Sequence, residues 1–382
     1  MNKIEQLIKE KCPNGVEYKK LKDLVNYIQP TKYIVKDIKY SDNYNIPVLT
    51  AGQTFILGYT NEEIGIYIAS NEKPVIIFDD FTTSNHWVDF KFKVKSSAMK
   101  ILISKTQNNF KYIYYCIQNI KYIPKEHSRQ WIQTFSEFKI PIPPIEIQEE
   151  IVKILDKFSE LETELETELE ARKKQYEFWR KDLFFYKDVV KVKDICKKIT
   201  SGGTPSTSNT EYFNGTIPWL RTQEVNWNII TDTNIKISHD AILNSSAKII
   251  PSHCVIVAMY GATVGKVAIN NIPLSTNQAC CNLEINEKIA NYKYVFYWLS
   301  SQYDYIKSLG RGSQTNINAN IVKNLKIPLP PLQEQERIVK ILDKFDKLVN
   351  DISEGIPAEI EARRKQYEYY RNKLLNFKEI KE

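Results

Sequence analysis

Apolar residues recur every three to four positions over two long stretches of the chain, residues 151–183 and 338–374. This period is typical of a helix that buries one apolar edge, and over several turns it predicts a coiled-coil seam. Because two similar helices in one chain can bury their seams against each other, we expect them to form one antiparallel coiled coil. Its seam is predicted to include Ile151, Ile154, Phe158, Leu161, Leu165, Leu169, Ile338, Ile341, Phe345, Leu348 and Ile352.

Prolines mark the start of both helical stretches. They stand at positions 141, 143 and 144 before the first and at 328, 330 and 331 before the second. Since proline favours an extended chain before it and is tolerated in the first turn of a helix, we expect extended segments that lead into the helices. Gly355-Ile356-Pro357 lies inside the second stretch and predicts a kink or an interruption there.

The rest of the chain has the pattern of short strands with a few helices. Runs of β-branched and aromatic residues at 74–78, 91–95 and 253–260 are bounded by turn residues and predict strands. Aromatic-rich stretches at 108–119 and 290–305 predict helices. The expected fold class is therefore α+β, with two globular heads separated by the two long helices. The predicted boundaries are 1–140 for the first head, 141–187 for the first helical region, 188–326 for the second head and 327–382 for the second helical region.

The chain contains an internal repeat, which organises all of these elements. IPIPPIEIQEEIVKILDKF at 140–158 recurs as IPLPPLQEQERIVKILDKF at 327–345, and ARKKQYEFWRKDL at 171–183 recurs as ARRKQYEYYRNKL at 362–374. The heads match only faintly, as KLKDL at 20–24 does with KVKDI at 191–195. These matches indicate a tandem duplication with pseudo-two-fold symmetry. A molecule that keeps two helical regions alike and changes two heads is suited to hold identical partners while it recognises two different targets.

The two copies differ in length inside the helical regions. The second has four more residues between Phe345 and Ala362 than the first has between Phe158 and Ala171, where the sequence is SELETELETELE. A four-residue step preserves the seam and changes a helix by ~6 Å at ~1.5 Å per residue. That length corresponds to about one to two base pairs of DNA at ~3.4 Å each. The repeat therefore suggests a ruler between the heads, and the alternative is an ordinary solvated acidic helix face.

Charge is distributed unevenly along the 382 residues. The formal net charge is +7, but residues 146–170 contain ten acidic residues against two lysines, which leaves +15 for the rest of the chain. Such a basic excess suits a protein that binds a polyanion.

The cysteine, histidine and hydrophobic patterns argue against a disulfide-bonded, metal-binding, membrane or secreted protein. The six cysteines form no C-x-x-C pair and the four histidines are scattered, so we expect no disulfide frame, no metal site and no cofactor. No apolar run approaches the ~18 residues of a membrane span, and the N-terminus lacks the apolar core of a signal peptide. We therefore expect a cytoplasmic protein without a membrane partner.

Polar loops in both heads contain candidate DNA-contacting residues, because hydroxyl, amide and cationic side chains suit phosphates and base edges. In the second head these candidates are Thr204, Ser206, Arg221, Thr222, Gln223, Thr263, Lys266, Arg311, Ser313 and Gln314. Residues 127–130 of the first head, taken as the equivalent of residues 311–314, add Ser128, Arg129 and Gln130. The alternative is that these are ordinary surface loops.

Two motifs raise the alternative of an enzyme. GATVGK at 261–266 is one residue short between its glycines and lacks the Ser or Thr that a phosphate-binding loop uses to hold magnesium. Asp79 and Asp80 with Asp89 and Lys91 form a pattern found in the metal clusters of nucleases. A stand-alone metal-dependent DNA nuclease is therefore the alternative function. A scaffold that binds only proteins is a third hypothesis, against which the basic excess argues.

The whole chain resembles the specificity (HsdS) subunits of Type I restriction–modification systems. The resemblance rests on GGTPSTSNTEYFNGTIPWLRTQEV at 202–225, YGATVGKVAI at 260–269, STNQACC at 275–281 and the paired helical motifs. It implies two target-recognition domains that each read one half of a bipartite double-stranded DNA site. It also implies an antiparallel coiled coil that sets the spacing of the half-sites and docks two methylation (HsdM-type) subunits, which bind S-adenosylmethionine and methylate adenine. A separate ATP-driven restriction (HsdR-type) subunit translocates and cuts DNA, so the specificity subunit itself is not an enzyme.

The resemblance also extends the set of candidate DNA contacts. Segments 50–62 and 78–90 of the first head depart from the pattern of the second head, so the two heads are expected to read different half-sites. The candidates added in this way are Thr50, Gln53, Thr82, Thr83, Ser84, Tyr260, Asn277 and Gln278.

Overall fold

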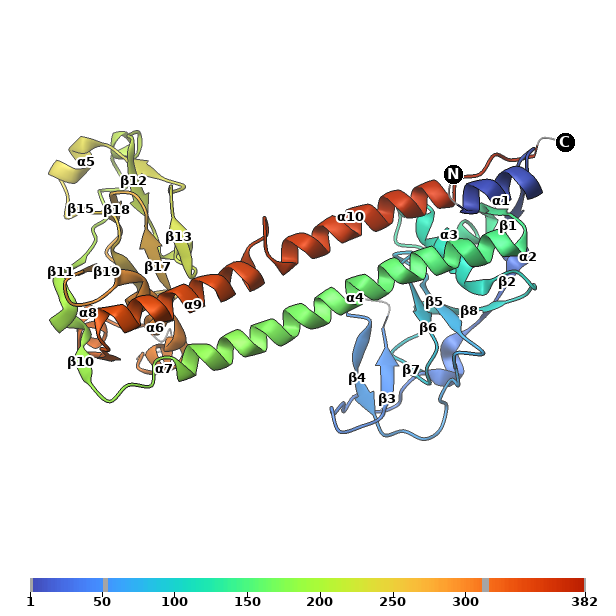
Figure 1. Ribbon diagram of the computed structural model, residues 1–382, viewed down its shortest axis with the longest axis horizontal. Helices are drawn as coiled ribbons and strands as arrows, with labels where there is room; N and C mark the ends of the chain where they lie inside the picture. Colours follow the sequence, from blue (N-terminus) through green and yellow to red (C-terminus); the bar gives the residue numbers. More distant parts are fainter. Residues whose placement is uncertain (1–2, 51–53, 311–315, 381–382) are drawn as a thin grey trace. The chain divides into compact units, whose positions relative to one another are not determined.

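The structure is a computed structural model that describes residues 3–50, 54–310 and 316–380. It divides into two compact units, Met1–Leu165 with Ile360–Glu382, and Glu166–Glu359. Each unit holds one of the predicted heads together with parts of both helical regions (Figure 1). The predicted α+β class and the duplication are confirmed, since both units repeat the same kinds of sheet and helix in the same order.

Unit 1 carries the first head. Strands β2, β8, β5 and β6 form an antiparallel sheet in that order, strands β4, β3 and β7 form a second sheet, and β1 pairs with β9 next to the long helix. Helix α3 packs between the first sheet and α4 (Figure 1). The bounds are α1 Lys3–Lys11, β1 Glu17–Lys20, α2 Leu21–Leu24, β2 Val25–Ile28, β3 Ile46–Leu49, β4 Ile56–Thr60, β5 Val75–Asp79, β6 Asn85–Val88, β7 Lys93–Val94, β8 Met99–Ser104, α3 Phe110–Asn119 and β9 Lys139–Ile142.

Unit 2 carries the second head on the same plan. Strands β11, β19, β16, β17 and β13 form the larger sheet, β14, β12, β18 and β15 form the smaller one, and β10 pairs with β20. Helix α6 contacts both β17 of the larger sheet and helix α9. The bounds are β10 Val189–Lys191, β11 Cys196–Ser201, β12 Ile217–Leu220, β13 Asn228–Ile230, β14 Lys236–Ile237, α5 His239–Leu243, β15 Ile249–Ile250, β16 Val255–Ala258, β17 Val267–Asn270, β18 Leu274–Thr276, β19 Cys280–Ile285, α6 Tyr292–Ser301, α7 Tyr303–Ser308, α8 Ala319–Asn324 and β20 Lys326–Pro328.

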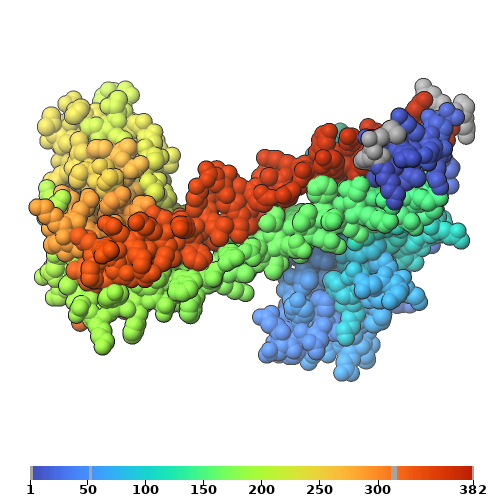
Figure 2. All heavy atoms as spheres, in the orientation of Figure 1, coloured from blue at the N-terminus to red at the C-terminus, as the bar shows by residue number. Residues whose placement is uncertain are grey.

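The helical regions form an antiparallel pair within each unit. They consist of α4 (Ile145–Asp182), α9 (Leu332–Asn350) and α10 (Ile356–Leu374). In unit 1, Phe158 stacks on Tyr370 at 5.5 Å while Glu162 pairs with Arg364, so α4 and α10 run in opposite directions. Figure 2 shows α10 lying against α4 in this unit. In unit 2, the second part of α4 packs against α9.

Burial along the predicted seam is uneven. Ile151 and Ile338 are fully buried, whereas Leu161 and Leu348 are 39% and 38% exposed. The remaining seam positions on the helices are half-buried, namely Ile154, Phe158, Leu165, Leu169, Ile341 and Phe345. The seam therefore packs most tightly where each helix meets its head.

Ile352 departs from the prediction, because it is 85% exposed and lies in a turn between α9 and α10. The Asp351 carboxylate accepts the N–H groups of Ser353 and Glu354, which ends α9. Pro357 stands in the first turn of α10, where its missing N–H leaves no helical bond unmade. The four extra residues of the second copy fall across this turn, and α4 has no such interruption.

The same buried hydrogen bonds attach each head to its helix. The side-chain oxygen of Gln148 accepts the N–H of Asn109 at 3.0 Å, and its amide group donates to the carbonyl of Pro143 at 2.8 Å. In unit 2, Gln335 bonds Asn291 and Pro330 in the same way, both at 2.8 Å. The two glutamines are 1% and 0% exposed. We call this arrangement the glutamine joint.

A tyrosine and a carboxylate complete the attachment in both units. Tyr115 of α3 donates to Asp156 of α4, and Tyr297 of α6 donates to Asp343 of α9 at 2.7 Å. Burial and the adjacent carboxylate raise the pKa of both tyrosines well above the ordinary range, so their hydroxyl groups remain donors. Each head is thereby fixed to its helix by a buried glutamine and by a buried tyrosine that bonds a partly exposed carboxylate.

None of the described helices combines the length and the hydrophobicity needed to cross a membrane.

The glutamine joint predicts a large loss of stability on truncation. Gln335→Ala leaves the partly buried N–H of Asn291 and the buried carbonyl of Pro330 without partners, each costing about 1–3 kcal/mol. We expect the free energy of unfolding of unit 2 to fall by roughly 2–4 kcal/mol, measured by urea unfolding of the full-length chain. Gln333→Ala, at an exposed position on the same helix, is the control and should change stability by less than about 0.5 kcal/mol. Equal effects of the two variants would contradict this role.

Candidate nucleic-acid interface

The candidate residues of the second head gather at one end of its sheets. Antiparallel pairing of β16 with β17 and β19, and of β11 with β19, brings the ends of β11 and β16 beside the starts of β17 and β19. Parallel pairing of β12 with β18 adds the residues after these two strands, where the N–H of Asn277 donates to the carbonyl of Leu220 at 2.9 Å. Six strand ends therefore place their loops on a common edge.

Side-chain contacts link these loops to one another. The Thr263 hydroxyl donates to the carbonyl of Thr222 at 2.7 Å, and the Thr204 hydroxyl donates to the side chain of Gln278. The structure thus brings Thr204, Arg221, Thr222, Thr263, Asn277 and Gln278 together. Ser206, Gln223 and Tyr260 are exposed in the same loops.

The glycines at 202 and 203 have a packing role that the sequence did not reveal. A Cβ at Gly202 would lie 2.0 Å from the carbonyl oxygen of Thr276, and one at Gly203 would lie 2.3 Å from the nitrogen of Ala247. The carbonyl of Gly203 also accepts the indole N–H of Trp219 at 3.0 Å. Close backbone packing is therefore what requires glycine at both positions.

Trp227 lies beside the candidate Lys266, and it was not predicted from the sequence. It is 40% exposed, has a φ of 53°, and lies 4.5 Å beneath the ammonium group of Lys266. The same ammonium group donates to the side chain of Asn226 at 2.7 Å. A left-handed backbone is strained for a bulky residue and tends to occur at functional sites. The pattern NWN at 226–228 carried no signal for it.

The first head presents the equivalent end of its sheets. The N–H of Lys95 donates to the carbonyl of Leu49 at 2.8 Å, which matches the bond from Asn277 to Leu220 in the second head. Thr50 follows β3 at this end, and Thr82 and Ser84 lie in the loop between β5 and β6. Ser128 and Arg129 belong to a neighbouring loop, because the N–H of the next residue, 130, donates to the carbonyl of Asp80.

Two candidates of the first head are buried and do not fit a direct contact with DNA. Gln130 is 4% exposed, and its side chain bonds Tyr122 and Ser128. Thr83 is 9% exposed, has a φ of 63°, and its hydroxyl donates to the preceding carbonyl. Both shape the loops from inside instead of facing outward.

The correspondence between the two heads also needs a correction. The N–H of Gln130 donates to the carbonyl of Asp80 at 2.7 Å, and the N–H of Ile317 donates to that of Met259 at 3.0 Å. Residue 130 therefore corresponds to residue 317, and Arg129 to Asn316, instead of residues 127–130 corresponding to 311–314. Gln53, Arg311, Ser313 and Gln314 lie outside the described residues.

Two aspartates of the nuclease-like pattern, Asp79 and Asp80, make structural contacts within the first head. The Asp79 carboxylate accepts the N–H of Phe81 at 2.8 Å and the hydroxyl of Thr82 at 2.7 Å, so it holds the turn after β5. Asp80 is 1% exposed and pairs with two cationic side chains. Within residues 3–50, 54–310 and 316–380, no group of three or more potential ligands from His, Cys, Asp and Glu could hold a metal ion. The alternative of a stand-alone nuclease is therefore not supported.

The cysteines of the second head are packing residues. Burial raises the pKa of Cys254 and Cys281 to about 12 and that of Cys280 still higher, so these thiols remain protonated. All six cysteines of the chain are free thiols. A buried thiol of high pKa is a poor nucleophile, which fits a core role.

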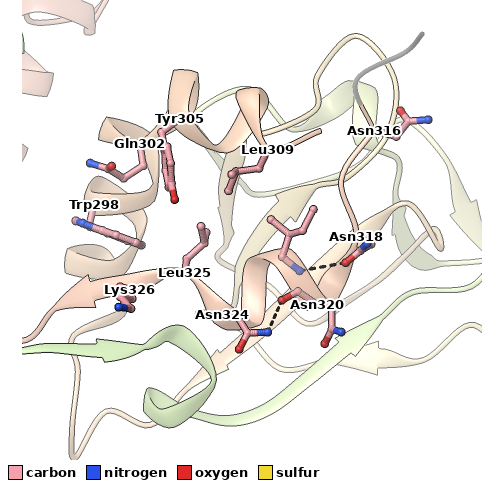
Figure 3. A pocket seen from close by; sticks show the side chains of 11 residues that line it. Trp298, Gln302, Tyr305, Leu309, Asn316, Asn318, Asn320, Asn324, Leu325 and Lys326 are labelled. Atoms are coloured by element: carbon pink, nitrogen blue, oxygen red, sulfur yellow. Dashed lines mark hydrogen bonds between the residues drawn. The ribbon is translucent and has the colours of Figure 1, made fainter. Parts of the chain in front are cut away.

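A cleft of about 870 Å³ opens beside the loops of the second head (Figure 3). Trp298, Gln302 and Tyr305 line one side, and a series of asparagines lines the other. The side chain of Asn318 accepts the N–H of Ile321, and that of Asn324 donates to the carbonyl of Asn320. These amides thus serve the short helix α8, and the cleft contains no carboxylate among its lining residues.

Comparison with known proteins decides the family. A family model described as the Type I restriction modification DNA specificity domain matches the chain twice, over residues 13–172 and 186–362. The chain belongs to the Type I restriction modification DNA specificity family. Each matched segment contains one head and the helical stretch that follows it, so the family unit and the internal repeat coincide.

Relatives in this specificity family cover nearly the whole chain. The Type I restriction enzyme EcoR124I/EcoR124II specificity subunit of Escherichia coli is 44% identical over 391 residues, which cover 96% of both chains. A putative type I restriction enzyme specificity subunit of Haemophilus influenzae is 30% identical and covers 95% of this chain and 96% of that one.

Solved structures support the fold of the family. The Type I restriction–modification S subunit of M. genitalium matches with a TM-score of 0.57 at 14% identity, over 96% of this chain and 98% of that one. A chain from a type I restriction–modification system solved for its assembly and conformational transition matches with a TM-score of 0.61 at 14% identity, over 95% and 98%. At this identity the likeness concerns the fold.

The contacts of Asp79 predict a structural effect and no catalytic one. Asp79→Ala removes the acceptor of two backbone N–H groups and a hydroxyl, so we expect the free energy of unfolding to fall by about 1–3 kcal/mol. Asp89→Ala is the matched control from the same sequence pattern and should have a small effect. The measurements are urea unfolding and magnesium-dependent cleavage of plasmid DNA by the purified chain. Cleavage that disappears in either variant would restore the nuclease hypothesis.

Proposed function

We propose that this chain is the DNA-reading specificity subunit of a Type I restriction–modification complex. Each head reads one half of a bipartite double-stranded DNA site with the loops at its sheet ends. The helical regions set the spacing of the half-sites and dock two methylation subunits. Restriction subunits join through that complex. The chain itself contributes recognition and no catalysis.

One observation carries this proposal. The two heads share a frame of equivalent backbone hydrogen bonds and the same glutamine joint, yet the loops on the equivalent sheet ends differ in sequence. A repeated frame with two different sets of exposed polar side chains is what recognition of two unlike half-sites requires. The basic excess outside residues 146–170 supplies the attraction to phosphates.

The spacing role is supported by α4. It is one unbroken helix of 38 residues whose first part belongs to unit 1 and whose second part belongs to unit 2. The tetrapeptide repeat lies in its middle, at residues 159–170, away from both glutamine joints. A change in the number of repeats therefore alters the helical length between the heads and leaves each head's attachment intact.

The docking role is supported by the repeat itself. The most similar segments, 140–158 with 327–345 and 171–183 with 362–374, are on the helices, where unit 1 and unit 2 present nearly the same side chains. Two copies of one partner need two equivalent surfaces, and the helical regions supply them. Methyl transfer then belongs to the partner, which must hold the methyl donor.

Deletion of one TELE unit, residues 163–166, tests the proposal as a whole. The chain and its methylation subunit are expressed together, and the adenine methylation of the host genome is mapped by long-read sequencing. The wild-type chain should give a split motif, and the deletion should shorten its gap by about one to two base pairs with both half-sites unchanged. The matched control exchanges the same unit for AELA, which keeps the helix length and should keep the gap.

Two outcomes of this experiment would count against the proposal. If the complex methylates DNA without a split motif in any strain, the two heads do not read separate half-sites. If the motif is split and the gap is unaffected by the deletion, α4 does not set the spacing and only the recognition part of the proposal stands.

Lys266 predicts a phosphate contact of the second head. Lys266→Ala removes a cation held over an exposed tryptophan at the sheet end, so the affinity of the assembled complex for all DNA sequences should fall. We expect the slope of log affinity against log salt concentration to decrease by about one, measured by fluorescence anisotropy. Lys288→Ala, in the exposed turn that follows β19 at the opposite end of the sheet, should leave affinity and slope unchanged. A change in base preference with an unaltered slope would contradict a phosphate contact.

A further inference from the structure

Arg129 is unusual in the first head. Residues 1–144 contain 19 lysines and a single arginine, which is Arg129. Lysine is a compact charge on a flexible stem and suits phosphates, whereas arginine presents a planar fork of donors. The one arginine lies in the loop at the sheet end that the structure places beside β5 and β8.

A buried carboxylate holds the guanidinium group of Arg129. Its Nη1 atom lies 3.3 Å from Oδ2 of Asp80, and the same nitrogen is 3.4 Å from the carbonyl oxygen of Ser97. Asp80 is 1% exposed, and its other oxygen accepts the N–H of Trp131 at 2.9 Å. The carboxylate is thus fixed by the fold and offers one oriented edge to the arginine.

A buried lysine shares this carboxylate. Nζ of Lys100 lies 3.3 Å from Oδ2 of Asp80 and donates to the side chain of Gln29 at 2.6 Å. The Lys100 side chain is 3% exposed, whereas that of Arg129 is 48% exposed. Two cations on one carboxylate leave a net charge of +1, and the only strongly exposed member of the group is Arg129. Within residues 3–50, 54–310 and 316–380, its remaining guanidinium nitrogens have no protein partner.

Aromatic side chains limit the movement of the arginine further. The guanidinium carbon lies 5.9 Å from the centre of the Phe81 ring, and His127 stacks on the same ring at 4.7 Å. An arginine with one edge paired and one face against a ring is restricted to few orientations. Such preorganisation reduces the entropy lost when a ligand binds to its free edge.

We propose that Arg129 recognises a guanine in the half-site of the first head, with Asp80 as the residue that positions it. This inference rests on the proposed function. The free edge of a guanidinium group matches the O6 and N7 acceptors of guanine in the major groove, and this pair discriminates among all four base pairs. A phosphate contact would be weakened by the carboxylate behind the arginine, and lysines are plentiful in this head for that purpose.

The second head lacks this device at the corresponding position. Asn316 replaces Arg129, and its side chain accepts the N–H of Gly261. Met259 occupies the position of Asp80, so the carboxylate that holds the arginine in the first head has no counterpart at this position. Selection of a guanine by a carboxylate-held arginine at this position is therefore proposed for the first head and not for the second.

The test uses Arg129→Ala and Arg129→Lys in the complex with the methylation subunits. In the methylated motif of the Ala variant, one position that is guanine in the wild-type motif should accept any base. The other positions, the other half-site and the gap should be unchanged. Affinity for the wild-type site should fall about 10- to 100-fold, and affinity for sites changed at that guanine should not fall further. Lysine keeps the charge without the fork, so Arg129→Lys should also relax this position. Lys125→Ala, in the same loop region, is the control and should keep the motif.

The role of Asp80 is tested in a double variant that replaces both members of the buried Asp80–Lys100 ion pair. Asp80→Asn with Lys100→Met leaves no buried charge unpaired, and the asparagine oxygen still accepts the N–H of Trp131. This variant should relax the same single position, a readout that general destabilisation of the head does not produce, since destabilisation lowers methylation of the unchanged motif.

Two other outcomes overturn the inference without touching the proposed function. An unchanged motif with uniformly weaker binding and a salt slope smaller by about one would make Arg129 a phosphate contact. An unchanged motif with unchanged affinity would place Arg129 outside the interface. Loss of the split motif already in the wild-type chain would instead refute the function on which the inference rests.

Discussion

The structure depends on a buried glutamine that fixes each head to its helix. Gln148 and Gln335 each satisfy the N–H of the residue that caps a head helix and a carbonyl of the proline-rich entry to the long helix. A recognition head on a flexible attachment would lose orientational entropy each time it bound DNA, which would weaken binding. A buried hydrogen-bond donor or acceptor costs free energy when its partner is missing. Few other side chains could therefore replace these glutamines. This requirement agrees with the close repeat of 140–158 as 327–345, which contains both glutamines.

Variation in the heads is possible because their frame is built from backbone bonds. The bonds from Lys95 to Leu49 and from Asn277 to Leu220 join main-chain atoms, so they survive a change of either side chain. The loops at the strand ends then carry unrelated side chains on the same supports. This separation lets a duplicated domain acquire a new half-site without a new fold.

The repeat, the helices and the fold class were predictable because their signals are local periodicities and direct sequence matches. The candidate site was predictable only as a set of loops. Burial of Gln130 and exposure of Trp227 depend on contacts with distant residues, and no local pattern contains that information. The break before α10 was indicated by Pro357, but its position at 351–355 follows from the cap that Asp351 forms.

In the proposed function, spacing and recognition depend on different parts of the chain, the middle of α4 and the loops at the sheet ends of the heads. In the repeat of α4 only Ser159, Glu162, Leu165 and Leu169 are partly buried, and the remaining residues are exposed, so one more or one fewer unit changes little packing. The glutamine joints, in contrast, involve Gln148 near the start of α4 and Gln335 near the start of α9. A four-residue step keeps the helical face in nearly the same orientation, since it differs from one turn by about 0.4 residues. Under the proposed function, the half-site gap can therefore change in evolution without loss of either head's specificity, and a head can change its target without altering the gap.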